Sequence, residues 1–245
     1  TGGTASVYAL GAGLELLFLA ALGRVRYLQS PSPAPRGRSW RDMLAGAEFI
    51  WRRKVILGAS SLDLFAVLLG GATALLPVFA DRILHVGPVG FGWLRAAPSL
   101  GAIAMALWIA HRPPLARPGR ALLWSVAAFG AATIAFGFST SFWLSLVALM
   151  LTGAFDNISV VVRQSLVQLL TPDELRGRVT AVNQIFIGSS NEIGALRAGL
   201  SSAALGPVAA VVWGGIGTLA VTALIARTVP ALRSLPPLHT LQPEK

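Results

Sequence analysis

Three carboxylate side chains stand inside apolar runs of this sequence: Asp63, Asp156 and Glu192. If the runs are helices that cross a bilayer, a rise of about 1.5 Å per residue puts Asp63 roughly 12 Å from the start of its run, Asp156 about 21 Å and Glu192 about 20 Å. An ionised group is costly at that depth and is a functional candidate. A carboxyl group there can bind and release a proton as its access to water changes, which is the chemistry of proton coupling. The alternative is that these carboxylates pair with arginine or with the backbone and hold helices together.

Amide side chains add hydrogen-bonding groups to the run that holds Glu192. Asn191 adjoins that carboxylate, and Asn183 and Gln184 lie two turns earlier. Such groups either line a polar cavity or join neighbouring helices, and the sequence leaves both readings open.

Three arginines fall near the ends of apolar runs. Arg95, Arg163 and Arg197 are expected to extend their long stems to the membrane interface. Because Asp156 and Arg163 are seven residues apart and share a helix face, an ion-pair network that includes Asp156 is also possible.

Enzyme chemistry has no candidate residues here. The chain has no cysteine, and its three histidines, His85, His111 and His239, lie outside the apolar runs. No metal-ligand spacing, phosphate-binding loop or nucleophile with a nearby base occurs. We therefore expect neither an enzyme nor a cofactor.

The elements that hold these residues are predicted to be membrane-spanning helices. The 245 residues are 54% hydrophobic and 12% charged, whereas soluble domains have about 25% charged residues. A span needs about 20 apolar residues. Seven segments qualify, near residues 5–23, 55–80, 92–110, 121–138, 142–168, 179–200 and 206–226.

Basic residues alternate between successive loops. Eight lie in residues 24–54, three in 111–120, two in 170–178 and three after 226, whereas the other loops hold one or none. Lys and Arg are enriched in cytoplasmic loops, so these segments and the C-terminus are predicted to be cytoplasmic. The net charge of +10 is thereby explained without nucleic acid as a partner.

The order of the segments predicts an all-α integral membrane protein with a six-helix transporter bundle, preceded by one extra transmembrane helix and an amphipathic cytoplasmic helix. That helix is expected either to lie on the membrane surface or to pack on the cytoplasmic ends of the bundle. Because the chain opens on Thr1, we expect it to be a fragment whose N-terminal spans are missing. The expected domains are 1–23, the last helix of a truncated N-terminal bundle; 24–54, a central cytoplasmic loop with the amphipathic helix 39–53; 55–226, the C-terminal six-helix bundle; and 227–245, a cytoplasmic tail.

Specific strings resemble the second half of major facilitator exporters of the enterobactin-exporter type. They are LDLFAVLLGGATALLPVFA at 62–80, HVGPVGFGWLRAAPSLGA at 85–102 and DNISVVVRQSLVQLLTPDELRGRVTAVNQIFIGSSNEIG at 156–194. The resemblance implies two bundles that rock about a central substrate site, and proton-driven export of a siderophore, drug or other small molecule across the cell membrane. The implied partners are the lipid bilayer, the small-molecule substrate, protons and the missing N-terminal bundle.

The resemblance also implies roles for individual residues. Asp63 and Asp156 would face the other bundle, Asn191 and Glu192 would lie near the cavity, and a cytoplasmic turn with Asp173, Glu174, Arg176 and Arg178 would contribute to gating. The chain departs from the family where an acidic residue is expected four positions after Glu192, in a stretch like GEFESG. This chain has GALRAG there, with Leu196 and Arg197.

Two other functions stay open. The chain could be a non-transporting scaffold or accessory half-transporter, in which the carboxylates only pair internally. A channel-like permease is a third possibility, although no ring of charges or filter-like segment supports it.

Overall fold

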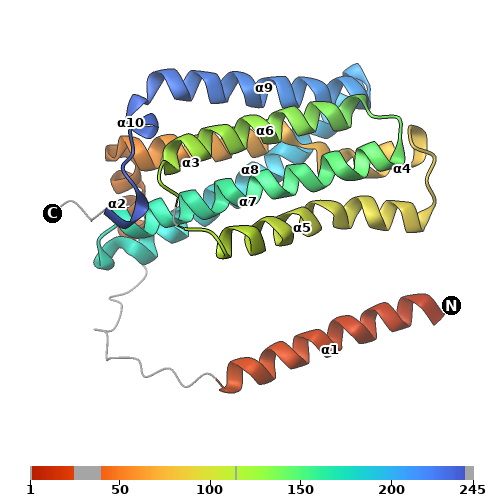
Figure 1. Cartoon of the computed structure of the whole chain (residues 1–245), viewed down its shortest axis with the longest axis horizontal. Helices are drawn as coiled ribbons and strands as arrows, with labels where there is room; N and C mark the ends of the chain where they lie inside the picture. Colours follow the sequence, from red (N-terminus) through yellow and green to blue (C-terminus); the bar gives the residue numbers. More distant parts are fainter. Residues whose placement is uncertain (1, 25–39, 114, 241–245) are drawn as a thin grey trace. The chain divides into compact units, whose positions relative to one another are not determined.

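The computed structural model describes residues 2–24, 40–113 and 115–240. The chain divides into two units, residues 1–38 and 39–245. The first unit contains helix α1 (Gly2–Arg24), whose 23 residues cover the span predicted at 5–23. Figure 1 draws both units.

The second unit is built from helices. They are α2 (Trp40–Arg52), α3 (Lys54–Gly70), the 3-10 turn η1 (Ala72–Leu75), α4 (Leu76–Arg82), α5 (Pro88–Ala110), α6 (Pro118–Phe138), α7 (Phe142–Leu170), α8 (Asp173–Leu205), α9 (Pro207–Thr228), α10 (Pro230–Arg233) and the 3-10 turn η2 (Leu238–Thr240). Within the described residues, five of the seven predicted segments are long and apolar enough to cross a membrane: Lys54–Arg82, α5, α6, α7 and α9. Helix α8, predicted as span 179–200, is longer, at 33 residues, and more polar than these five. The all-α membrane fold is confirmed.

Proline and glycine set the helix boundaries. Pro88, Pro118 and Pro207 stand in the first turns of α5, α6 and α9, where their missing N–H costs no helical hydrogen bond. Between α8 and α9, Gly206 has φ +84°, a conformation that glycine adopts without strain, and so α9 follows α8 after a single residue.

The helices of the second unit pack in a continuous series (Figure 1). Helix α5 packs on α7, α7 on α6, α6 on α9, α9 on α3, and α3 on α8. Two glycines allow α5 and α7 to cross closely. A Cβ at Gly101 would overlap the Met150 carbonyl, and a Cβ at Gly153 would overlap the Pro98 carbonyl. Backbones that approach this closely gain dispersion contacts that lipid cannot supply.

Two apolar clusters form most of the core. One surrounds Phe79, Leu94, Phe136 and Leu149, between η1, α4, α5, α6 and α7. The other surrounds Leu62, Leu122, Val162, Leu166 and Leu232, and ties α10 to α3, α6 and α7.

Helix α2 matches the predicted amphipathic helix 39–53 closely, and it packs on the bundle. Its contacts are with α8 and α3. Ile50 is buried, and a Cβ at Gly46 would come 2.9 Å from the backbone of Arg178. Leu44 and Trp51 stay exposed on another face of α2. The sequence left open whether this helix lies on the membrane surface or packs on the ends of the bundle. The buried face of α2 packs on the bundle.

Candidate transport site at a discontinuous helix

The apolar run at 55–80 is not one continuous helix. Helix α3 ends at Gly70, Gly71 has φ +28°, and η1 leads into α4. Pro77 lies in the first turn of α4, and its ring would clash with the carbonyl four residues earlier in an unbroken helix. Gly71 supplies the left-handed backbone, which L side chains rarely adopt. This break was not predicted from the sequence. The signal that could have indicated it is the pair Gly70–Gly71 followed by Pro77.

A helix that ends inside a membrane leaves carbonyl groups without helical partners, and these must be satisfied by protein. Arg197 of α8 does this: its Nε donates to the Leu68 carbonyl at 2.8 Å and its Nη2 to the Leu69 carbonyl at 2.6 Å. The guanidinium also faces the negative end of the α3 dipole. The expectation that Arg197 extends to the membrane interface is wrong, because its side chain caps a neighbouring helix.

A cavity of about 200 Å³ opens beside this break. One wall is the irregular backbone from Gly70 to Ala74. The opposite walls include Thr152 and Asp156 of α7 and Asn191 of α8. Irregular backbone at membrane depth is tolerated where it lines a cavity, and in transporters it often forms the binding site. Asp156 is half-buried in this wall and is the cavity's one carboxylate among the described residues.

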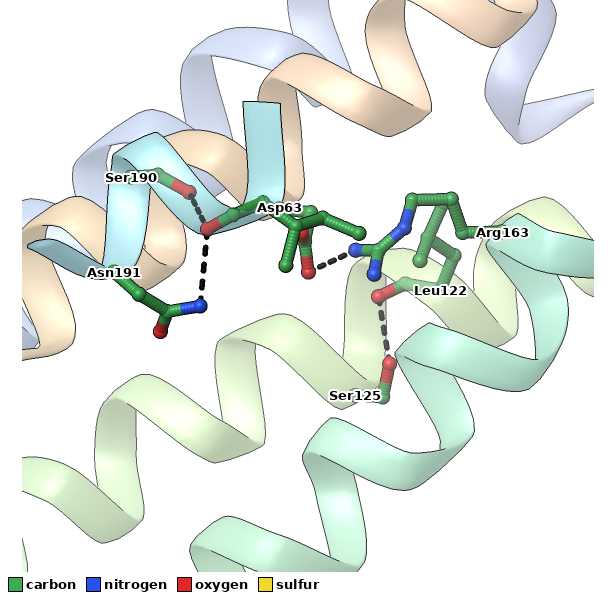
Figure 2. Close-up of polar contacts among 7 residues, drawn as sticks. Asp63, Leu122, Ser125, Arg163, Ser190 and Asn191 are labelled. Atoms are coloured by element: carbon green, nitrogen blue, oxygen red, sulfur yellow. Dashed lines mark hydrogen bonds and ion pairs between the residues drawn. The ribbon is translucent and has the colours of Figure 1, made fainter. Parts of the chain in front are cut away.

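Behind the cavity, Asp63 of α3 forms an ion pair with Arg163 of α7 (Figure 2). Their side chains are only 7% and 3% exposed. The prediction that Arg163 extends to the interface is wrong, because the bundle encloses its side chain. Removing either partner would leave the other charge buried and unpaired, which is strongly unfavourable.

A second, smaller space joins the two carboxylates. It measures about 10 Å³ and is lined by Asp63, Asp156 and Ser159, with Phe129 and Phe155 among its apolar walls. The Ser159 hydroxyl is buried and has no hydrogen-bond partner in the described part of the chain. A space of this size, with several polar groups around it, suits one water molecule.

The polar residues of α8 divide between two faces. Asn191 lines the cavity, and its amide donates to the Ile187 carbonyl at 2.9 Å, beside Ser190, whose hydroxyl donates to the same carbonyl (Figure 2). Asn183 is buried. Gln184 and Glu192 are exposed and line neither of the two spaces described above.

The predicted gating turn is mostly helix. Helix α8 begins at Asp173, so Asp173, Glu174, Arg176 and Arg178 occupy its first two turns. Both acidic residues stand at the positive end of the helix dipole. Asp173 also pairs with Arg176 at 2.6 Å.

The sequence allowed that a carboxylate pairs with arginine, and Asp63 does so, but it predicted neither Arg163 as its partner nor the helix cap made by Arg197. Depth along a helix marks polar residues as candidates, but it carries no information about which neighbouring helix a side chain meets. Asp63 and Arg163 are 100 positions apart, and Arg197 reaches carbonyls 128 and 129 positions away.

A multi-pass bundle with a discontinuous helix and a polar cavity beside the break is typical of secondary transporters. Sequence comparison gives the family. Residues 1–242 match the model of the transmembrane secretion effector family of major facilitator proteins, and the chain belongs to that family.

Curated relatives are exporters. The enterobactin exporter EntS of Escherichia coli O139:H28 (strain E24377A / ETEC) is 29% identical over 233 residues, which cover 95% of this chain and 56% of that protein. EntS of Shigella boydii serotype 18 aligns with the same values. The chain therefore spans about half the length of the curated relatives it matches. No solved structure matches it significantly. The predicted resemblance is confirmed, and the family is one of transporters.

Proposed function

We propose that this chain supplies one bundle of a proton-coupled exporter of small molecules, in which Asp156 carries the coupled proton. The observation that carries the proposal is the position of Asp156. This half-buried carboxylate lines both the cavity beside the helix break and the small space next to Asp63.

The neighbouring charges favour Asp156 over the other two carboxylates. Asp63 already has Arg163 as a partner, so protonating it would cost a buried ion pair. Glu192 is exposed on α8 and lies outside the cavity. Asp156 has no ion-pair partner among the described residues, and it can gain or lose a proton without leaving an opposite charge unpaired.

In the proposed cycle, Asp156 takes a proton from water in the cavity when the cavity is open to one side. A neutral carboxyl group costs less free energy to remove from water than a charged one. Protonation therefore favours the state in which the cavity is closed and the state in which it opens to the other side of the membrane. The proton leaves when the cavity opens to the other side. A water molecule at Ser159 would couple the charge on Asp156 to the Asp63–Arg163 pair.

The substrate enters this proposal as a class. The cavity walls combine apolar side chains with the amide of Asn191, the hydroxyls of Thr73 and Thr152, and one carboxylate, which suits a largely apolar molecule with a few polar groups. The enterobactin exporters are named for a siderophore. A siderophore or a drug-like compound is therefore the substrate class that we propose.

Transport would require a second bundle. The exposed face of α8 presents Gln184 and Glu192 among apolar side chains such as Ile193 and Leu196, a mixture unsuited to lipid. We propose that this face meets the other bundle across the substrate pathway, in the plasma membrane, with the C-terminus of this chain in the cytoplasm.

The test is export driven by an imposed pH gradient in everted membrane vesicles that contain the full-length protein, with ethidium and enterobactin as probes. Asp156→Asn should abolish gradient-driven transport while leaving membrane insertion unchanged. The matched control is Asp81→Asn, the same chemical change at an exposed position at the end of α4. Normal transport by Asp156→Asn would refute the assignment, and a wild-type protein that moves neither probe would favour the accessory function.

A further inference from the structure

A groove of about 570 Å³ lies between α6 and α9, apart from the candidate transport site. Most of its wall is apolar, formed by residues such as Leu123, Trp124, Leu219 and Ala223. Two cations, Arg120 and Arg233, close one end of it. Both arginines are exposed, and neither has an ion-pair partner in the part of the chain that the structure describes.

The bundle holds these two cations close together. Arg120 stands in the first turn of α6, and Arg233 ends α10. Leu232, the residue before Arg233, is completely buried in the core. Its carbonyl packs so tightly on Gly119, the residue before Arg120, that a Cβ at Gly119 would overlap it. The backbones that carry Arg120 and Arg233 are therefore held close together by packing.

The groove's position matches one end of a membrane span. Trp124 lies one turn after Arg120 and is 72% exposed, and tryptophan in spans concentrates at the level of the lipid headgroups. Three small side chains, Ala127, Ala223 and Ala226, also line the groove. The basic loops predict that this end of the bundle is cytoplasmic, where anionic lipid headgroups attract arginine.

We propose that this groove binds one anionic phospholipid of the cytoplasmic leaflet. Arg120 and Arg233 hold its phosphate through charge-assisted hydrogen bonds, and an acyl chain lies along the alanines and Leu219. A molecule with both an anionic head and a long apolar tail satisfies both parts of the groove, whereas a free anion would satisfy only the two arginines. This site does not depend on the export proposal and stands if that proposal fails.

The experiment is a native mass-spectrometry titration of the delipidated full-length protein in detergent with phosphatidylglycerol and, separately, phosphatidylcholine. The wild type should bind phosphatidylglycerol more tightly. Arg120→Gln and Arg233→Gln should each weaken phosphatidylglycerol binding about fivefold, since one basic residue near anionic lipid contributes ~1 kcal/mol. The double variant should lose the preference between the two lipids.

Two further variants separate charge from shape. Arg112→Gln is the matched control, because Arg112 is also exposed but lies outside the groove. Arg112 follows α5, and its Cζ lies 4.9 Å from the centroid of the Trp108 ring. It should bind lipid as the wild type does. Ala223→Leu narrows the exposed groove and keeps both arginines, so it should weaken binding of both lipids. Wild-type affinity in the arginine double variant would overturn the proposal, as would full displacement of the lipid by glycerol phosphate, which has no tail.

Discussion

The cap that Arg197 places on the end of α3 allows a quantitative prediction. Replacing Arg197 with Met removes two charge-assisted hydrogen bonds, of 2.8 and 2.6 Å, and leaves the Leu68 and Leu69 carbonyls without these partners. Such bonds contribute about 1.5 to 3 kcal/mol each, and the half-buried position of Arg197 favours the lower value. The expected loss in the free energy of unfolding is therefore about 3 kcal/mol.

Thermal unfolding in detergent measures this loss. At roughly 2 to 4 °C per kcal/mol for a domain of this size, Tm should fall by about 6 to 12 °C. Hydrogen exchange of the backbone amides should accelerate more in residues 68–76, which begin with the two freed carbonyls of Leu68 and Leu69, than in α6. Arg197→Lys keeps the charge but replaces the guanidinium, which donates through two nitrogen atoms, with a single ammonium group. The Tm of Arg197→Lys should therefore lie between that of the wild type and that of Arg197→Met.

Arg95→Met is the matched control, since Arg95 is an exposed arginine within α5. It should leave Tm and amide exchange unchanged. Equal Tm values for Arg197→Met and the wild type would refute the capping argument. An equal fall in Arg95→Met would show that any arginine in a span has the same effect.

Two further predictions concern packing inside the bundle. Asp63→Leu should lower the free energy of unfolding by about 3 to 5 kcal/mol, because it leaves Arg163 buried and unpaired. Adding Arg163→Leu to this variant should restore most of the loss. Thermal unfolding of the two single variants and the double variant checks this, and a double variant whose loss is the sum of the single losses would contradict it. Gly153→Ala should reduce the amount of folded protein in membranes, because the new Cβ would overlap the Pro98 carbonyl. Gly188→Ala should not reduce it, because a Cβ at that position meets nothing within 4 Å. Size-exclusion chromatography measures the yield of folded protein, and equal yields of the two variants would refute the close crossing of α5 and α7.

The helices of this protein are strongly encoded in local sequence. Apolar length predicted the five segments that the structure gives as long and apolar enough to cross a membrane, and the amphipathic pattern predicted 39–53 where the structure has Trp40–Arg52. Both signals are local, because a helix satisfies its own backbone and its boundaries depend on nearby proline and glycine. The same reasoning missed the break at Gly71, since an apolar run looks continuous even where the backbone is not.

The candidate site was predictable only as a set of residue types. The presence of Asp156 and Asn191 inside apolar runs marked them as candidates, and the structure brings them to one cavity. The partners of Asp63 and the destination of Arg197 depend on which helices are neighbours, which local pattern does not report. Arg197 lies in the stretch GALRAG at residues 194–199, and its structural role is to cap a helix.

The most direct test of the central claim is to measure proton release when substrate binds to the purified full-length protein in weakly buffered detergent with a pH-indicator dye. If Asp156 carries the coupled proton, the wild type should release close to one proton per bound substrate, and Asp156→Asn should bind substrate and release none. Proton release by Asp156→Asn equal to that of the wild type would contradict the account.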